Sequence, residues 1–206
     1  MLVGSVGTGK TSLVQGFLRD KASDTLLSST INTSFYTDAA AMQRCVIRVC
    51  RLLCYSSLAY QRSGKTYGPP SSKQLIYFVD DLNMPFIEEY GTQTPIALLR
   101  QYMDYRGWYD RGDLGLRKNV VDVQFLGAMN HKSGSFTINP RLQRHFVALA
   151  CQTPGNDDLA TIYGAVIGGH LSAFPSDVRR FVGPILDATI SVHRSVCAKF
   201  LPTAVK

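Results

Sequence analysis

The chain has 206 residues, of which 45% are hydrophobic and 18% charged, and its formal net charge is +7. This length excludes two complete large domains but allows one α/β domain, or one domain and part of another. The composition argues against a disordered chain, and no apolar run is long enough for a membrane span. The first residues lack secretory-signal features, and the five cysteines lack zinc-site spacing. We therefore expect a cytoplasmic protein without a membrane partner.

Most of the positive charge lies in one segment. Residues 39–79 contain no Asp or Glu, but they contain the basic residues Arg44, Arg48, Arg51, Arg62, Lys65 and Lys73. A basic surplus can indicate nucleic-acid binding when it is spread over a recognition surface. Because this surplus is confined to one segment, we expect no nucleic-acid partner.

The predicted elements alternate between strand and helix over most of the chain. Leu2 and Val3 end a buried strand, and residues 11–21 follow as a helix. Four more strands are expected at residues 30–37, 74–81, 120–130 and 145–150, with a helix at residues 94–105 that Pro95 opens. This alternation predicts an α/β fold with a parallel five-stranded sheet flanked by helices.

Beyond Pro154 the pattern becomes helical throughout. Asn156 or Asp157 can cap a first helix, and Ser176 a long second segment. Pro184 is expected to kink or interrupt that segment. A second, helical part of the chain is therefore predicted.

The stretch between the first strand and the first helix has the pattern of a phosphate-binding P-loop, G-x-x-x-x-G-K-[ST]. The loop and the start of its helix comprise Gly4, Ser5, Val6, Gly7, Thr8, Gly9, Lys10, Thr11 and Ser12. Glycines let backbone N–H groups point at phosphate oxygens, at a helix N-terminus that favours negative charge. Lys10 is expected to reach the β- and γ-phosphates of ATP, and the Thr11 hydroxyl to bind Mg²⁺. The alternative is a glycine-rich turn, which the flanking strand and helix disfavour.

Two carboxylates end the expected apolar strand at residues 74–81. Ligands of open α/β sheets bind at this carboxyl edge. Asp80 is expected to hold the Mg²⁺ shell, and Asp81 stands where many such ATPases place a Glu that orients the attacking water. Taken alone, two Asp residues after an apolar run more often mark the turn that ends a strand. Because a P-loop precedes them in this chain, they strongly indicate the carboxylates of a nucleotide site.

Three further residues are candidate nucleotide-site residues because of their positions relative to the predicted strands. Asn130 ends the fourth strand, where its amide can contact the attacking water or the γ-phosphate, although Asn is also a common turn former. Arg141 and Arg144 precede the fifth strand and could stabilise charge on a neighbouring subunit's γ-phosphate. Surface arginines without a role are an equally good interpretation.

Long strings in the chain resemble one family. They are "IYFVDDLNMP", "EEYGTQTPIALLRQYMDYRGWYD", "VQFLGAMNHKSGSFTINPRLQRHF" and "TPGNDDLATIY". Together they resemble the third AAA+ module of axonemal dynein heavy chains, and "SFYT", "YGPP" and "SGSFTINPRLQRHF" look most like the outer-arm type.

The resemblance implies a P-loop NTPase of AAA+ type in a ring of six modules, within a microtubule motor of the ciliary or flagellar axoneme. Its implied partners are the neighbouring AAA+ modules, and, through the parent heavy chain, intermediate and light chains and microtubules. Within the family's motifs, Lys10 and Thr11 match Walker A, Asp80 and Asp81 match Walker B, and Asn130 matches the first sensor. Arg144 resembles the arginine finger that completes the preceding module's site, with Arg141 as second choice.

The resemblance also implies a domain division. Residues 1–153 correspond to the large AAA+ subdomain, and residues 154–206 to the start of a helical lid that is truncated before its second sensor arginine. Residues 44–61 depart from the family because they are longer, basic and rich in cysteine. They are either a real insertion, such as a basic helix extension, or a gene-model artefact.

Three functions follow as alternatives. The first is an ATP·Mg²⁺-binding module that hydrolyses ATP slowly in a regulatory role and is weak or inactive in isolation. The second is a structural or regulatory module that binds nucleotide without hydrolysing it, which Asp81 in place of Glu keeps open. The third, a DNA-handling AAA+ ATPase, ranks last because its only support is the basic segment.

Overall fold

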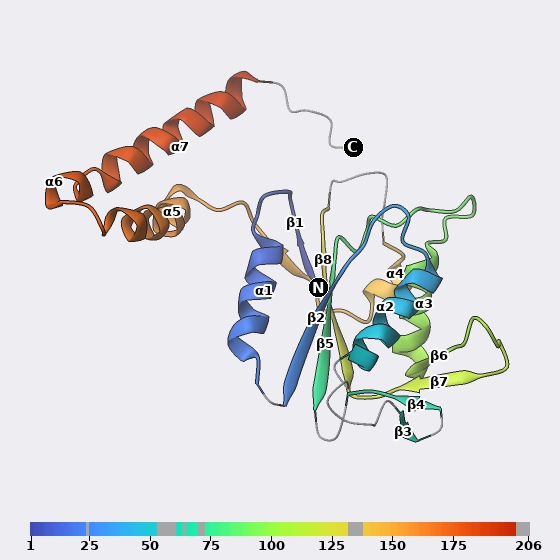
Figure 1. The fold of residues 1–206 in the computed structure, drawn as a ribbon. Coiled ribbons are helices and arrows are strands. Elements are labelled where there is room, and N and C mark those ends of the chain that lie inside the picture. The colour runs from blue at the N-terminus through green and yellow to red at the C-terminus, as the bar shows by residue number, and fades with distance from the viewer. Residues whose placement is uncertain (24, 53–60, 64, 70–72, 132–137, 201–206) are drawn as a thin grey trace. The chain divides into compact units, whose positions relative to one another are not determined.

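Five parallel strands form the main sheet of the computed structural model (Figure 1). They are β1 (Leu2–Gly4), β2 (Leu26–Asn32), β5 (Gln74–Asp80), β8 (Val123–Met129) and β9 (Leu149–Cys151), in the order β2-β5-β8-β1-β9. Strands adjacent in the sheet are not consecutive in the chain, so the chain crosses over between them. The predicted α/β fold with a parallel five-stranded sheet is confirmed.

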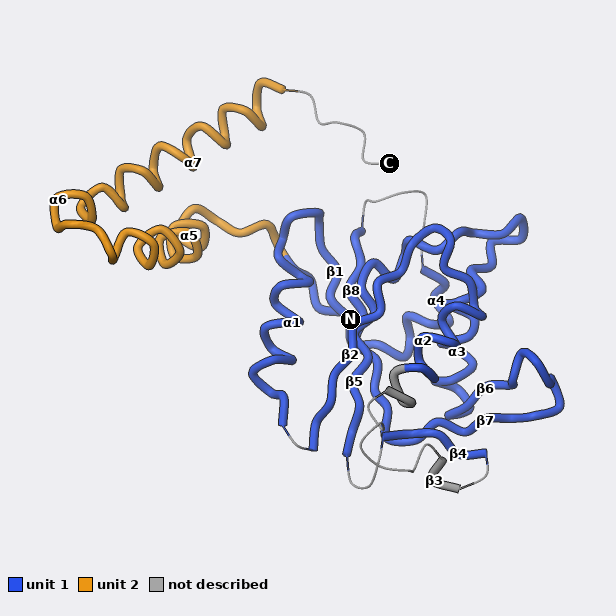
Figure 2. Tube along the Cα trace, in the orientation of Figure 1, with its two compact units in different colours: residues 1–151 blue, residues 152–206 orange. Residues whose placement is uncertain are grey.

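The structure describes residues 1–23, 25–52, 61–63, 65–69, 73–131 and 138–200. They fall into two units, Met1–Cys151 and Gln152–Lys206, which Figure 2 colours separately. The first unit contains both sheets, and the second contains helices only.

Strand β5 shows why the sheet is covered on both faces. Its residues alternate between two apolar clusters, with Leu75, Tyr77 and Val79 in one and Ile76 and Phe78 in the other. Side chains of successive strand residues point to opposite faces, so a continuous apolar run requires a helical layer on each side. Figure 1 shows α1 (Lys10–Lys21) on one side of the sheet and α2 (Ala39–Leu52) with α3 (Thr94–Tyr105) on the other.

Each layer is held by a few buried side chains. Val14 and Leu18, one turn apart on α1, are 4% and 5% exposed and pack against the cluster that contains Phe78. On the other face, the Tyr102 hydroxyl of α3 donates to the carbonyl of Val123 at 2.9 Å and so fixes the helix to β8. The expected bounds of α3 are confirmed, with Pro95 in its first turn.

A second, smaller sheet was not predicted. Its four strands are β3 (Gln61–Ser63), β4 (Thr66–Tyr67), β6 (Gly107–Tyr109) and β7 (Arg117–Val120), in the order β3-β4-β7-β6. Each has at most four residues, and runs this short show no alternation that a sequence pattern can detect.

Several predicted strand bounds were wrong. The expected strand at residues 30–37 is β2, which begins at Leu26 and ends at Asn32. The expected strand at 120–130 contains the end of β7 and, after Asp122 with a φ of 54°, the separate strand β8. The expected strand at 145–150 is β9, which begins only at Leu149 because the short helix α4 (Pro140–Gln143) is followed by a turn.

The second unit consists of α5 (Asn156–Leu171), α6 (Ser176–Arg179) and α7 (Val182–Lys199). The N-cap of α5 is Gly155, and that of α6 is Pro175, so the N-cap role expected of Asn156 or Asp157 and of Ser176 was wrong. Pro184 lies within the first turn of α7, where its missing N–H costs no helical hydrogen bond. The helical interruption expected there falls earlier, between α6 and α7.

The atypical segment at residues 44–61 begins inside α2, which continues to Leu52. Residues 53–60 lie outside the described part of the chain, as do residues 201–206 at the end of the predicted lid. Within α2, the Val46 side chain is buried at 1% exposed, and the Val46 backbone carbonyl accepts a hydrogen bond from the Tyr77 hydroxyl at 2.7 Å.

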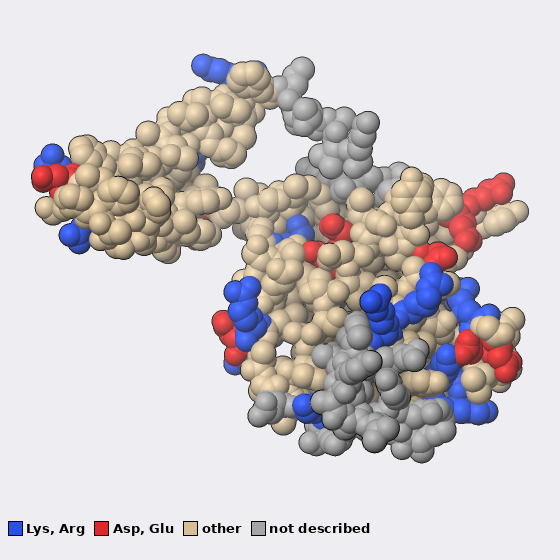
Figure 3. All heavy atoms as spheres, viewed as in Figure 1, with Lys and Arg blue, Asp and Glu red and all other residues tan. Residues whose placement is uncertain are grey.

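Lys and Arg side chains gather over α2 and the β6–β7 hairpin (Figure 3). Two acidic residues of the hairpin region, Asp110 and Asp113, lie in the same area, and Lys118 forms an ion pair with Asp110. The charge on this face is therefore mixed rather than a continuous basic stripe.

Candidate functional site

The loop between β1 and α1 has the backbone that a phosphate cradle requires. Gly7 and Gly9 have φ values of 79° and 76°, in the left-handed region where side chains with a Cβ are disfavoured. A Cβ built on either glycine would meet no atom within 4 Å, so the space beside the loop is open. Gly9 is the N-cap of α1, which makes the loop lead directly into a helix N-terminus.

Gly4 is required for a different reason, close packing. A Cβ on Gly4 would lie 2.4 Å from the backbone oxygen of Cys151 in β9. The first glycine of the motif therefore lets β1 and β9 pair at the point where the loop begins.

Lys10 lies along the loop that precedes it. Its Nζ donates to the carbonyl oxygens of Gly4 at 3.0 Å and Ser5 at 2.7 Å, and contacts Thr8 Oγ1 at 3.3 Å. The Thr8 hydroxyl donates in turn to the Ser5 carbonyl at 3.0 Å. The ammonium group is thus held at the loop, where it adds positive charge to the helix N-terminus.

Thr11 and Asp80 meet although they are far apart in sequence. The Thr11 hydroxyl donates to Asp80 Oδ2 at 2.7 Å, which joins the first turn of α1 to the end of β5. A hydroxyl and a carboxylate are the protein ligands that P-loop proteins offer to Mg²⁺, with phosphate oxygens and water as the others. The residues of this structure therefore fit a Mg²⁺–nucleotide complex.

Asp81 follows in an unusual backbone conformation. Its φ is 54°, and its N–H donates to Asp80 Oδ1 at 3.1 Å. Asp and Asn tolerate this left-handed region better than most residues do. Burial raises the pKa of the Asp81 carboxyl above its usual value of 3.8, the charge of Asp80 raises that pKa further, and Lys10 opposes the change.

Thr33, which sequence reasoning missed, fixes the turn that carries both carboxylates. It is 7% exposed, and its hydroxyl lies 3.0 Å from the carbonyl of Asp80 and 2.5 Å from that of Asp81. Its backbone N–H also donates to the Asp80 carbonyl at 3.1 Å. A threonine at a strand end is a common residue, so no local pattern marked it.

Asn130 stands directly after β8, the strand between β5 and β1. It is 8% exposed, and its carbonyl accepts a hydrogen bond at 3.1 Å from the amide of Asn83, which is 1% exposed. Asn83 was also missed by sequence reasoning. The bond joins the loop after the two carboxylates to the end of β8, so Asn130 lies at the same carboxyl edge of the sheet.

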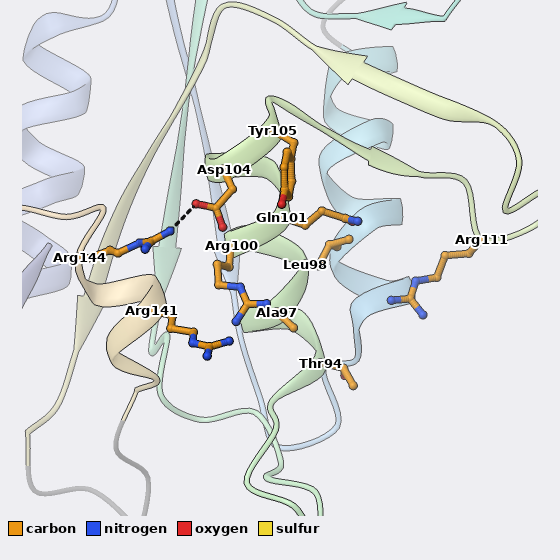
Figure 4. A pocket seen from close by; sticks show the side chains of 10 residues that line it. All are labelled: Thr94, Ala97, Leu98, Arg100, Gln101, Asp104, Tyr105, Arg111, Arg141 and Arg144. Carbon is orange, nitrogen blue, oxygen red and sulfur yellow. Dashed lines mark hydrogen bonds and ion pairs between the residues drawn. The ribbon is translucent and has the colours of Figure 1, made fainter.

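The two predicted arginines lie in a different place. Arg144 directly follows α4, and its Nη2 donates to Asp104 Oδ1 of α3 at 2.8 Å. Arg144 and Arg141 line a pocket between α3 and α4 (Figure 4). Among the described residues that line this pocket, none belongs to the P-loop. The structure therefore brings Lys10, Thr11, Asp80 and Asp81 together and leaves the arginines outside that group.

Neither a membrane span nor a dedicated metal cluster is found in the part of the chain that the structure describes. No described helix has the length and apolar character needed to cross a bilayer. No three His, Cys, Asp or Glu residues of the described ranges are grouped so that they could hold a metal ion.

Comparison with known proteins gives a consistent result. Residues 1–154 match the family described as "P-loop containing dynein motor region". The whole chain is 42% identical to "Dynein axonemal heavy chain 17" of Mus musculus and 41% identical to "Dynein beta chain, flagellar outer arm" of Chlamydomonas reinhardtii. It is 40% identical to "Dynein beta chain, ciliary" of Heliocidaris crassispina. In each case the alignment covers 100% of this chain but only 4% of the relative. The chain has the predicted P-loop fold, and the family model matches it over most of its length. The chain therefore belongs to the P-loop-containing dynein motor region family.

Proposed function

We propose that this chain binds ATP with Mg²⁺ at its P-loop and serves as a nucleotide-binding AAA+ module, the third, of an axonemal dynein heavy chain. The observation that carries the proposal is the 2.7 Å hydrogen bond between Thr11 and Asp80. This bond joins Thr11 and Asp80, the two residues proposed to hold Mg²⁺, and the loop nearby has open space beside Gly7 and Gly9.

Each residue has a specific role in this proposal. Backbone N–H groups of residues 5–9 and the start of α1 bind the phosphates, and Lys10 neutralises part of their charge. Thr11 and Asp80 hold Mg²⁺, which stabilises negative charge on the transferred phosphate when it is bound. Asp81 orients and accepts a proton from the attacking water, while Asn130 contacts that water or the γ-phosphate.

The parent protein's activity and partners are part of the same proposal. The relatives are named as axonemal, ciliary and flagellar dyneins. We infer that this module acts beside other AAA+ modules of one heavy chain, which with intermediate and light chains drives microtubule sliding in the cytoskeleton of a cilium or flagellum. Arg144, with Arg141 as second choice, is proposed to contact the nucleotide of the preceding module.

Replacing Lys10 tests the nucleotide site. Lys10→Ala should abolish ATP·Mg²⁺ binding, because the variant removes the cation that the loop holds beside its carbonyl oxygens. Binding is measured with a fluorescent ATP analogue. Lys21→Ala at the far end of α1 is the matched control and should bind like the parent chain. Equal affinity in the Lys10 variant and the control would refute the P-loop assignment.

A second candidate, binding without hydrolysis, is favoured by Asp81. Its side chain is shorter than Glu, and its backbone is left-handed. Asp81→Asn should leave ATP binding intact and, if Asp81 is the base, lower single-turnover hydrolysis by about 10² or more in the intact heavy chain. An unchanged hydrolysis rate would support the non-hydrolysing alternative. The isolated chain should hydrolyse ATP poorly in either case, since a finger arginine from another module contributes about 10³ to 10⁵ in rate.

A further inference from the structure

Three aromatic side chains gather on the surface where two loops meet. The first loop, residues 33–38, follows β2, and the second, residues 81–93, joins β5 to α3. The ring of Phe35 lies edge-on to the ring of Tyr36 at 5.3 Å and to that of Phe86 at 5.2 Å, measured between centroids. The three side chains are 44%, 88% and 52% exposed. Exposed apolar side chains that are grouped, unlike scattered ones, indicate an interaction surface.

Hydrogen bonds hold both loops in place. The N–H of Phe86 donates to the carbonyl of Phe35 at 3.1 Å and so joins the two loops directly. The buried Gln93 amide donates to the carbonyl of Pro85 at 2.7 Å and fixes the base of the second loop. The rings are therefore held in position before a partner binds, which lowers the entropic cost of association.

The second loop also carries two carboxylates. Glu88 and Glu89 follow closely after Phe86, and both are exposed. Within the part of the chain that the structure describes, neither forms an ion pair. No Lys or Arg occurs in residues 22–43 or 74–99, which contain the two loops. Acidic side chains are visible at the end of the loop between β5 and α3 (Figure 3). The loops thus combine aromatic rings with negative charge on a chain whose net charge is +7.

This combination determines the charge of a suitable partner. Carboxylates repel phosphate groups, so neither nucleic acid nor an anionic membrane complements these loops. Lys and Arg side chains bind the faces of aromatic rings and pair with carboxylates, while their aliphatic stems cover apolar surface. A peptide segment in which basic residues alternate with small apolar ones complements both the rings and the charge.

We propose that Phe35, Tyr36 and Phe86, together with Glu88 and Glu89, form an acidic aromatic surface that docks a basic segment of another polypeptide. Basic side chains of that segment lie over the rings and reach the two carboxylates. None of these five residues belongs to the P-loop, so the inference goes beyond nucleotide binding.

The test uses the 206-residue chain without nucleotide and a fluorescein-labelled peptide of alternating arginine and alanine, with binding measured by fluorescence anisotropy. Because the chain carries a net charge of +7, it does not attract this peptide as a whole, and binding reports a local surface. Tyr36→Leu and Phe86→Leu should each lower the affinity about threefold to tenfold, since leucine keeps apolar contact but removes the ring face. Replacing both Glu88 and Glu89 by Gln should lower it about threefold or more. Binding should also weaken as salt is raised.

Two exposed positions outside the surface provide matched controls. Tyr163→Leu on α5 removes an aromatic ring, and Asp20→Asn on α1 removes a carboxylate, so both should bind the peptide like the parent chain. Equal affinities for the surface variants and these controls would overturn the proposal. Equal binding of a glutamate–alanine peptide would overturn it as well and would indicate a purely apolar docking site. Tighter binding of single-stranded oligothymidine than of the basic peptide would contradict the predicted charge of the partner. Because no nucleotide is present, none of these outcomes depends on the P-loop assignment.

Discussion

At the scale of single residues, Thr33 has a larger role than its residue type suggests. One buried hydroxyl contacts the carbonyls of Asp80 and Asp81, and its own N–H reaches the first of them. It thereby stabilises the left-handed turn at Asp81 and sets the direction of both carboxylates. Positioning of the proposed Mg²⁺ ligand depends on this contact as well as on Asp80 itself.

Thr33→Val tests that role with little change in side-chain size. Loss of the hydroxyl should lower the free energy of unfolding by about 1 to 2 kcal/mol, because two carbonyls lose a buried donor. Affinity for ATP·Mg²⁺ should fall as well. Urea denaturation and nucleotide titration measure the two effects. Thr30→Val, at an exposed position of β2, the strand that Thr33 directly follows, should change stability by no more than about 0.5 kcal/mol. Matching values for the two variants would exclude the positioning role.

At the scale of elements, the site depends on how closely β1 approaches its neighbours. This strand has only three residues, yet it pairs with β8 on one side and β9 on the other. Gly4 makes the second pairing possible, because any side chain would collide with the backbone of Cys151. The same glycine begins the loop, so strand pairing and phosphate binding share one residue.

Gly4→Ala should therefore destabilise the chain by about 1 to 3 kcal/mol, through forced separation of β1 and β9. Gly16→Ala is the contrasting change. Gly16 lies in the interior of α1, and no atom lies within 4 Å of a Cβ added there. The substitution should therefore stabilise the folded chain by about 0.4 to 1 kcal/mol. Thermal unfolding of both variants measures the difference. A stabilising Gly4→Ala would show that the close approach is not maintained in solution.

Elements also differ in how well the sequence predicted them. The buried strand β5 and the helix α3 were placed well, since a long apolar run and a proline-opened amphipathic segment are strong local signals. The small sheet was missed because its strands have two to four residues, and because its two local strand pairs, β3–β4 and β6–β7, are joined into one sheet only by the long-range pairing of β4 with β7. Strand ends were misplaced where turns at Asp122 and after α4 interrupt apolar runs.

At the scale of the whole molecule, the two units differ in burial. The first contains both apolar clusters of the described residues. In the second, Leu186 of α7 is the only described hydrophobic residue that is buried, at 8% exposed, while apolar side chains such as Ile162 and Val192 are more than half exposed. Stability should therefore be distributed unevenly along the chain.

Hydrogen exchange measures this distribution directly. Amides of β5 and β8 should exchange slowly, because these strands lie inside the sheet and pack on both faces. Amides of α5 and α7 should exchange much faster, since little apolar area holds these helices in place. Equal protection of the amides in the two units would contradict this expectation. It would indicate that the apolar side chains of α5 and α7 are buried in solution.

The sequence by itself determined the fold class, the P-loop, the two carboxylates at the carboxyl end of β5 and the resemblance to dynein heavy chains. These features are local: a glycine spacing, an apolar run and long continuous strings each report the backbone or burial of a single segment. The tertiary structure decided which residues meet. Thr33 with Asp81, Asn83 with Asn130 and Asp104 with Arg144 are pairs separated by 40 or more residues. Their contacts depend on strand order and register, which a local pattern does not encode.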